Sequence, residues 1–375
     1  MKKYLLSLAV LMMATALFTA CGDDDDDSAP QRKAVDVSEG LFIVGSGNTR
    51  SNIDGNLTYI NYANGTSTLN AFQKANGISL GKTANFALIY GEKLYIAVDG
   101  ENTIWVCNKK TLVQERRINT MEIIGETNGV SPRSIAPYDG KIYVSCYGAG
   151  NTSTVAAIDT VDYKLQATYT TGSHSDGVAV VGDKLFVADS DYGNGSASVT
   201  VIDLKAGSVQ TIKHADITNP MQVATVGNYA YVLDYGTYTS DWSQQLGAGV
   251  RRVAADGTVT RLVDGTAMAV DNNRIYTVYA PFGGDGTHYY IYDINSGQKT
   301  EWEPEGIFSP AAIAVDPITG DIFIVSYNEN PDTGYPAYNL PTYVNQYSKD
   351  LTFKQRFDCG VGPISLVFNT GVKYE

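Results

Sequence analysis

The chain has 375 residues, of which 43% are hydrophobic and only 18% charged, a balance typical of a folded globular protein and not of a disordered or coiled-coil one. The formal net charge of −13 argues against nucleic acid as a partner, because an acidic surface repels phosphate groups. Four cysteines are too few for a disulfide scaffold, and 26 tyrosines with 37 glycines favour strands and tight turns over helices.

The first twenty residues have the pattern of an export signal. Lys2 and Lys3 precede an apolar stretch over residues 5–20, which is shorter than the roughly 20 apolar residues of a membrane-spanning helix. The stretch leads into Phe18–Cys21, which resembles the lipobox of bacterial lipoproteins, with phenylalanine where leucine is usual. The resemblance implies a signal peptide over residues 1–20 and lipidation of Cys21. An ordinary signal peptide that ends beside a cysteine is the alternative.

Five consecutive aspartates, Asp23–Asp27, follow the cysteine almost directly. Like charges that have no apolar residue to bury cannot fold, so we expect a lipidated acidic tether over residues 21–39. An acidic run at this place is similar to the lipoprotein export signal of the Bacteroidota. That similarity implies a lipid-anchored protein of the outer membrane that faces the cell exterior, and the periplasmic side is the alternative.

From residue 40 to the end, one strand pattern recurs seven times. Each copy places an aromatic side chain after an apolar one, and successive copies lie 43 to 53 residues apart. This spacing is the period of a β-propeller blade. The seven aromatic residues are Phe42, Tyr95, Tyr143, Phe186, Tyr231, Tyr276 and Phe323.

From the second copy on, another strand precedes the aromatic strand across a tight turn, and two further strands complete each unit. No window of helical period competes with these strands. The preceding strand carries a small residue at matching positions, and small side chains fit a strand that lines the crowded axis of a propeller. These residues are Ala87, Ala136, Ala179, Ala224, Ala269 and Ala314, with Val367 as the seventh equivalent.

The two ends of the chain complete one blade between them. The aromatic strand at Leu41 has no inner strand before it, and the inner strand 364–368 has no partner after it. Pairing the two closes the ring and removes an exposed sheet edge. The sequence therefore predicts an all-β, seven-bladed β-propeller of four-stranded antiparallel blades over residues 40–375.

The repeat resembles that of the YVTN/YncE-like propeller family. The segments Leu185–Asp189 and Ser198–Asp203 match the strand-then-"VID" pattern of that family, and prolines recur just before inner strands, as at Pro132 and Pro220. The resemblance spans residues 40–375 and implies the propeller fold. It leaves the function open, because propellers carry unrelated functions.

In a four-stranded blade, the loops between strands 2 and 3 share one face with the blade-to-blade connections. Here those loops are long and variable, and they hold aromatic residues beside acidic and amide groups, which is typical of a binding surface. Packing of the rim is the alternative interpretation. The candidate ligand-binding residues are Tyr147, Asp189, Asp191, Tyr192, Tyr235, Tyr238, Trp242, Phe282, Tyr327, Asn328, Tyr335 and Tyr338, with Arg133 at the start of an inner strand.

Signals for catalysis, metals and cofactors are weak. His174, His214 and His288 fall in different repeats, so no catalytic relay is predicted, although His174 falls on the long-loop face. Asp189 and Asp191 have the spacing of the first two ligands of a calcium-binding loop, but the acidic residue that should end such a loop is absent. We therefore expect no catalytic residues, no metal and no cofactor.

The lipobox, the acidic tether, the seven blades and the aromatic loop face together resemble the cobalamin-binding propeller lipoproteins of the Bacteroidota cell surface. The resemblance implies capture of a small molecule, cobalamin or another corrinoid, on the long-loop face and its delivery to a TonB-dependent outer-membrane transporter. Two alternatives stay open. One is a structural or adhesive propeller that binds glycan or protein, and the other is a propeller lyase or hydrolase with a metal or histidine cluster.

Overall fold

The structure is a computed structural model and describes residues 33–374. The expected signal peptide, the lipidated Cys21 and the aspartate run lie outside these residues. Residues 36–371 form one compact unit, which is the propeller. In the described part of the chain, no helix combines the length and the apolar character needed to cross a membrane.

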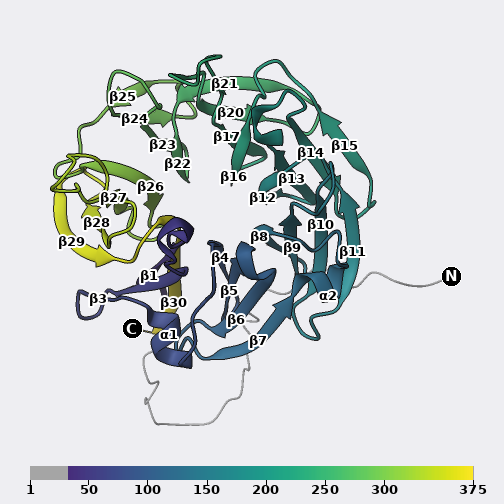
Figure 1. Ribbon diagram of the computed structural model, residues 1–375, viewed down its shortest axis with the longest axis horizontal. Helices are drawn as coiled ribbons and strands as arrows, with labels where there is room; N and C mark the ends of the chain where they lie inside the picture. The colour runs from purple at the N-terminus through teal and green to yellow at the C-terminus, as the bar shows by residue number, and fades with distance from the viewer. Residues whose placement is uncertain (1–32, 375) are drawn as a thin grey trace, which may run out of the picture. The chain divides into compact units, whose positions relative to one another are not determined.

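Within residues 33–374 the chain forms seven four-stranded antiparallel blades, arranged as a ring (Figure 1), which confirms the fold predicted from the repeat. From the inner strand outward, the blades are β30-β1-β2-β3, β4 to β7, β8 to β11, β12 to β15, β16-β17-β20-β21, β22 to β25 and β26 to β29. A small hairpin, β18-β19, is inserted between β17 and β20.

The strands of the first three blades are β1 (Ala34–Gly45), β2 (Asn56–Asn61), β3 (Thr66–Thr68), β30 (Pro363–Tyr374), β4 (Ala84–Tyr90), β5 (Lys93–Val98), β6 (Thr103–Asn108), β7 (Gln114–Asn119), β8 (Pro132–Tyr138), β9 (Lys141–Cys146), β10 (Thr154–Asp159) and β11 (Leu165–Thr170). Those of the other four are β12 (Ser175–Val181), β13 (Lys184–Asp189), β14 (Ser198–Asp203), β15 (Val209–Ile212), β16 (Pro220–Val226), β17 (Tyr229–Asp234), β18 (Thr237–Tyr238), β19 (Gln245–Leu246), β20 (Gly249–Val253), β21 (Val259–Asp264), β22 (Ala267–Asp271), β23 (Arg274–Tyr279), β24 (His288–Asp293), β25 (Lys299–Glu301), β26 (Ser309–Val315), β27 (Ile322–Tyr327), β28 (Thr342–Tyr347) and β29 (Phe353–Cys359).

The ring closes where the first aromatic strand meets the last inner strand, as predicted, because β1 lies beside β30 in one sheet. Next to this pair, the Ser46 amide donates a hydrogen bond of 2.7 Å to the carbonyl of Gly362. The expected boundary of the tether at residue 39 differs from the structure, in which β1 begins at Ala34. The reason is that the solvent-facing Asp36 stands between two half-buried valines, which is the alternation of a strand.

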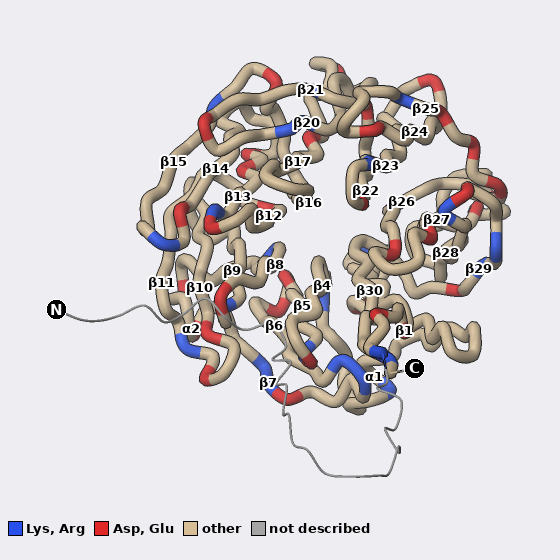
Figure 2. The backbone as a smooth tube through the Cα atoms, turned by 180° about the vertical axis from the view of Figure 1, so that it is seen from behind, with Lys and Arg blue, Asp and Glu red and all other residues tan. Residues whose placement is uncertain are grey.

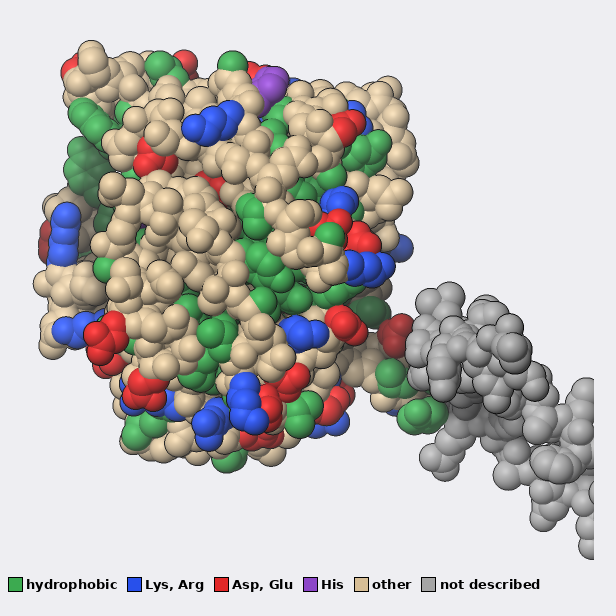
Figure 3. Space-filling view, turned by 90° about the vertical axis from the view of Figure 1, so that its right-hand side faces the viewer, with side chains coloured by type: hydrophobic (Ala, Val, Ile, Leu, Met, Phe, Trp, Pro, Cys, Tyr) green, Lys and Arg blue, Asp and Glu red, His purple; other side chains and the backbone are tan. Residues whose placement is uncertain are grey.

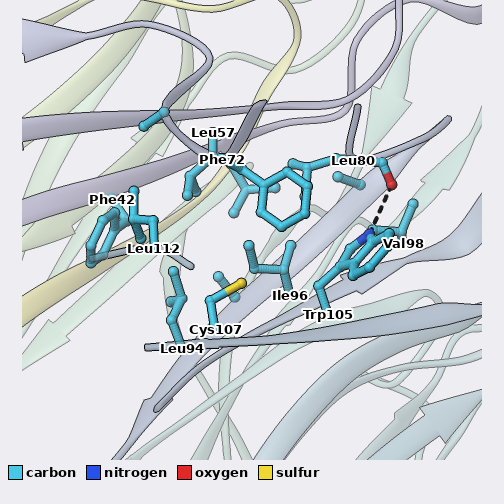
Figure 4. Close-up of a cluster of buried hydrophobic side chains, with 14 residues drawn as sticks. Phe42, Leu57, Phe72, Leu80, Leu94, Ile96, Val98, Trp105, Cys107 and Leu112 are labelled. Atoms are coloured by element: carbon cyan, nitrogen blue, oxygen red, sulfur yellow. Dashed lines mark hydrogen bonds between the residues drawn. The ribbon is translucent and has the colours of Figure 1, made fainter. Parts of the chain in front are cut away.

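The hydrophobic core lies between neighbouring blades. All seven repeat aromatics are buried, and Figure 4 shows the cluster between the first two blades. There Phe72 packs against Trp105 with ring centroids 5.3 Å apart, and the indole nitrogen of Trp105 donates to the carbonyl of Leu80 at 3.0 Å.

Phe72 belongs to α1 (Ala71–Asn76), which, like α2 (Thr120–Ile124), lies in a connection between blades. Neither helix was expected from the sequence, because one or two turns are too short to produce a helical period. Each helix nevertheless buries a hydrophobic side chain, Phe72 in α1 and Ile124 in α2. The described residues also form 3₁₀ turns at Thr49–Ser51, Asp99–Glu101 and Asp191–Gly193.

The repeated alanines lie on the inner strands, as predicted, but most of their side chains do not line the central cavity. In five blades the alanine pairs across the sheet with the repeat aromatic of the next strand, so both lie on one side of the blade, and the small side chain leaves room for the ring. The pairs are Ala136–Tyr143, Ala179–Phe186, Ala224–Tyr231, Ala269–Tyr276 and Ala314–Phe323. Of the six alanines, Ala314 alone lines the central cavity formed by the described residues.

The face that carries the short turns is highly charged. Ion pairs connect these turns within a blade, as between Lys109 and Glu92 at 3.2 Å and between Lys205 and Asp183 at 3.0 Å. Figure 2 shows both signs of charge distributed around the ring, and Figure 3 shows them interspersed on its flank. The pair of Lys205 and Asp183 is open to solvent, and ion pairs of that kind add little to stability because water and salt screen them. This face is a solvated surface, and the chemically distinctive groups lie on the other one.

Candidate functional site

A cavity of about 350 Å³ lies at the centre of the ring, where the inner strands begin. All seven inner strands contribute to its wall, and Tyr235 from the loop after β17 adds to it. Because each inner strand begins at a blade-to-blade connection, the cavity lies at the end of the axis that carries the long loops.

The two walls of the cavity differ in chemistry. In six of the seven blades, the second residue of the inner strand lines the cavity. This residue is polar in three consecutive blades, where it is Asn85 of β4, Arg133 of β8 and Asp176 of β12. It is apolar in the other three, where it is Met221 of β16, Met268 of β22 and Ile364 of β30.

A charged cluster on the polar wall joins three consecutive blades. Nη1 of Arg133 lies 2.5 Å from Oδ2 of Asp99, which follows β5, and Nε of Arg133 lies 2.8 Å from Oδ1 of Asp176 in β12. The ring of Tyr147 lies against the guanidinium, with 4.6 Å between Cζ of Arg133 and the ring centroid, and its hydroxyl donates a hydrogen bond to the other oxygen of Asp176. Asp99, Asp176 and Tyr147 therefore all contact Arg133, and the cluster carries two carboxylates for one guanidinium.

The protonation states in the cluster follow from burial and charge together. Burial disfavours the charge on Arg133, but Asp176, Tyr147 and Asp99 outweigh this effect and raise the pKa of Arg133, which stays protonated. Burial raises the pKa of Asp176, and the interactions with Arg133 and Tyr147 oppose the rise. Burial also raises the pKa of the Tyr147 hydroxyl, with a further contribution from Asp176, so Tyr147 keeps its proton at neutral pH.

An aromatic group covers the outer side of this cluster. The ring of Tyr147 lies 5.1 Å from that of His174 and 5.7 Å from that of Tyr192, between centroids, and the His174 and Tyr192 rings are 4.0 Å apart. The backbone of His174 has φ +52° and that of Tyr192 has φ +48°, a region that bulky residues rarely adopt. Such strain is often found where a binding site is held in place.

Tyr235 projects its side chain to the cavity wall from the loop after β17. Burial raises the pKa of its hydroxyl, and the nearby Asp176 adds to the rise. The hydroxyl makes no hydrogen bond to any residue in the range 33–374. It is therefore a free hydrogen-bonding group on the cavity wall.

The inserted hairpin β18-β19 carries two of the predicted residues. The rings of Tyr238 and Trp242 stack with centroids 5.2 Å apart and an angle of 25° between their planes. Gln245 holds the hairpin in place, because its side-chain amide donates to the carbonyl of Tyr235 at 2.7 Å and its backbone amide donates to that of Phe282 at 2.8 Å. Phe282 belongs to the next blade, so the long loops of two blades are joined here.

The loop after β27 brings a second aromatic pair to the same face. The ring centroids of Tyr327 and Tyr338 are 4.9 Å apart, and Nδ2 of Asn328 bonds the carbonyl of Pro341 at 2.9 Å within the loop. We call the most exposed aromatic residues of the long-loop face the aromatic rim. They are Tyr335 (73% exposed), Trp242 (68%), Phe282 (60%), Tyr338 (56%) and Tyr192 (53%).

Asp189 lies apart from this surface. It is fully buried at the end of β13, where Oδ1 accepts a hydrogen bond from Ser175 at 2.5 Å and Oδ2 accepts from Ser198 and Thr200 at 2.9 and 2.6 Å. Burial raises its pKa to about 6, although these hydrogen bonds oppose the rise. Asp191 caps its own loop through the amide of Ser196 at 2.9 Å. Among the described residues, no three His, Cys, Asp or Glu side chains are placed to hold a metal ion.

Sequence reasoning selected Arg133 and Tyr147 but missed Asp99 and Asp176, the two carboxylates that bond them. A signal for Asp176 was present, because it occupies the same inner-strand position as Arg133, one blade later. A signal for Asp99 was present as well, because it directly follows its aromatic strand, the position that Tyr147 and Tyr235 occupy in later blades. Only the folded ring brings its carboxylate to Arg133.

No family model and no curated protein matches the chain. Solved structures do match it. Hydrazine synthase of Kuenenia stuttgartiensis is 13% identical with a TM-score of 0.56, and the match covers 78% of this chain and 95% of that one. The WD40 repeats of RRP9 are 11% identical with a TM-score of 0.52, covering 74% and 81%, and the computationally designed Ika8 protein is 12% identical with a TM-score of 0.50, covering 78% and 96%. These likenesses show that the chain has a β-propeller fold of the kind that WD40 repeats form.

Proposed function

We propose that this protein is a non-enzymatic, lipid-anchored binding protein of the outer membrane that captures a small molecule on its long-loop face. The observation that carries the proposal is the aromatic rim, which projects from four consecutive blades on the face where the amphipathic cavity lies. Large exposed aromatic side chains are costly to leave in water and mark binding surfaces in soluble proteins. The charged cluster on the polar wall of the cavity adds polar groups that orient a ligand.

The ligand that we propose is cobalamin or another corrinoid. A corrinoid combines a flat apolar macrocycle with polar amide groups at its edge, which complements aromatic faces beside a polar cavity. It is too large for a cavity of about 350 Å³, so we place the macrocycle over the aromatic rim, with only a peripheral group inside. Anchoring through Cys21 on the cell exterior would let the protein pass the ligand to a TonB-dependent transporter.

The absence of enzymatic activity is part of the proposal. His174 precedes β12, His214 lies between β15 and β16, and His288 begins β24, so the three histidines belong to different parts of the ring. His288 bonds Glu301 at 2.8 Å near the outer edge of its blade, and the Nδ1 of His214 lies 3.6 Å from Asp216. His174 does lie beside a hydroxyl, since its Nδ1 is 2.7 Å from Oγ of the adjacent Ser173. Within residues 33–374, however, no carboxylate bonds the His174 ring, so a relay of nucleophile, base and orienting acid is not assembled there.

The test is a calorimetric titration of the purified chain with cyanocobalamin, with quenching of tryptophan fluorescence as a second readout. We expect saturable binding at micromolar concentration or below, weakened in Trp242→Ala. Val161→Ala is the matched control, because Val161 is an 84% exposed apolar side chain on the opposite face. No heat and no quenching with the unmodified chain would refute the corrinoid proposal.

A second candidate function is adhesion to a glycan. The specific observation in its favour is the exposed stack of Tyr238 and Trp242, because an aromatic plane with polar neighbours can pack against the face of a sugar ring. Binding on a glycan array without corrinoid binding would favour this function. Corrinoid binding without a glycan signal would exclude it.

A further inference from the structure

The cavity wall carries hydrogen-bonding atoms that the protein leaves unused. Within residues 33–374, Nη2 of Arg133 donates no hydrogen bond, although Nε and Nη1 both do. The Tyr235 hydroxyl is free as well, and the side-chain oxygen of Gln222 accepts nothing in this part of the chain, while its amide nitrogen donates to the carbonyl of Met268 at 3.3 Å. The wall therefore offers a charged donor, a hydroxyl and an amide acceptor.

We infer that the central cavity recognises an uncharged group that both donates and accepts hydrogen bonds, of the primary carboxamide class, carried on an apolar body. A carboxamide oxygen can accept from Arg133 or Tyr235, and a carboxamide nitrogen can donate to Gln222. The inference rests on the proposed function for the binding face, but it concerns the cavity and not the aromatic rim.

Charge in the cavity selects against an acid. Asp99 and Asp176 face one guanidinium, so the cluster has one formal negative charge in excess when both are ionised. A carboxylate that bonded Arg133 would meet both carboxylates in a region of low dielectric, where repulsion between like charges is strong.

Charge does not favour a base either. An ammonium group would be attracted by the excess charge, but it cannot accept from Nη2 of Arg133 and would lie beside another cation. A buried donor that loses water without gaining a partner costs about 1–3 kcal/mol. A group with both a donor and an acceptor avoids both penalties.

The opposite wall suits an apolar body. Met221, Met268, Ile313 and Leu366 line it, and the unbranched methionines can adjust to the shape of a ring or chain. Gly177 lets the strands β12 and β16 come together at the boundary of the two walls, because a Cβ there would lie 2.7 Å from Cα of Gln222. The volume of about 350 Å³ is enough for a molecule of the size of a single aromatic ring with a polar substituent.

The test uses three probes that share a phenyl ring and differ in the polar group: benzamide, benzoate and benzylamine. Binding to the full chain is measured by ligand-observed NMR titration at pH 7. We expect benzamide to bind at least tenfold more tightly than benzoate, and more tightly than benzylamine. Equal binding of the three, a preference for either charged probe, or no benzamide binding would overturn the inference.

Two variants tie the preference to the residues. Tyr235→Phe removes the free hydroxyl and should weaken benzamide binding severalfold with little effect on the fold. Asp99→Asn removes one negative charge that repels benzoate, so it should lower the ratio of benzamide affinity to benzoate affinity. The matched control is Asp139→Asn, because Asp139 is an exposed carboxylate in a short turn of the opposite face and its replacement should leave the ratio unchanged.

A parallel titration with cyanocobalamin separates this inference from the proposed function. Cyanocobalamin binding without selectivity among the three probes would overturn the inference and leave the proposed function standing. Selective benzamide binding without cyanocobalamin binding would support the inference and remove the corrinoid from the proposed function.

Discussion

Arg133 connects three blades, so its replacement is the sharpest test of what holds the polar wall together. We consider Arg133→Met, which keeps the apolar stem of the side chain and removes the charged group. The side chain of Arg133 is 16% exposed, and those of Asp99 and Asp176 are 20% and 9% exposed. The two ion pairs of Arg133 are therefore largely buried, unlike exposed ion pairs, which contribute only about 0–1 kcal/mol to the free energy of unfolding.

Removing one member of a buried ion pair costs about 3–5 kcal/mol, because the charge that remains has lost its partner. In the variant Asp176 also loses an interaction that opposes the burial-induced rise of its pKa, so that pKa rises further. A carboxyl group whose pKa is raised on folding stabilises the protein most below its unfolded pKa and loses this contribution as pH rises through its folded pKa. We therefore expect the loss to be greatest at pH 8 and smaller at pH 5.

The assay is urea denaturation at both pH values, followed by tryptophan fluorescence and circular dichroism. Arg133→Met combined with Asp176→Asn should recover part of the loss, because the uncompensated charge is gone. Lys164→Met is the control, since Lys164 forms an exposed ion pair with Asp162 that solvent screens, and its replacement should leave the free energy of unfolding nearly unchanged. A loss below about 1 kcal/mol for Arg133→Met, or equal losses at pH 5 and pH 8, would refute the reasoning.

Three further predictions follow from the structure. Trp242→Ala should weaken cyanocobalamin binding at least tenfold in calorimetry, or about 1.4 kcal/mol, without lowering Tm, because the side chain is 68% exposed. Burial raises the pKa of Asp189 to about 6, so the stabilisation that its protonated carboxyl contributes should fall by roughly 3 kcal/mol as pH rises from about 4 to about 6. Asp189→Asn should therefore flatten the dependence of stability on pH between pH 4 and pH 7 in urea denaturation, and unchanged slopes would contradict this. In Gly360→Ala the new Cβ would lie 1.7 Å from Oδ1 of Asn56, so urea denaturation should show a loss of about 1–3 kcal/mol, partly recovered by Asn56→Ala.

The local pattern of the sequence was sufficient for the ring and its closure, because aromatic and small residues recur at the spacing of a blade. The sequence did not predict the short helices, which are too short to show a helical period, or the cross-strand contacts that depend on how neighbouring strands pair. The helix α1 has six residues and leaves no helical period, yet its Phe72 packs against Trp105 in the core. The position of Ala136 opposite Tyr143 depends on the pairing of β8 with β9, which the sequence of either strand does not specify.

The loop face shows the same division. The aromatic side chains of the long loops could be selected from the sequence, since their residue types and their places between strands are local properties. Their exposure could not be, and Asp189 shows why. It stands beside Ser190 and Asp191 in a loop-like sequence, but it is the last residue of β13 and points inward to three hydroxyl groups.

The sequence by itself determined the fold class, the number of blades and the face that carries the long loops, because each depends on patterns within one repeat. Only the tertiary structure decided which side chains meet at the axis. Asp99 and Asp176 lie 34 and 43 residues from Arg133 along the chain, and the ring brings them within hydrogen-bonding distance. Contacts of this kind depend on the packing of inner strands from separate blades, and no pattern within one repeat records that packing.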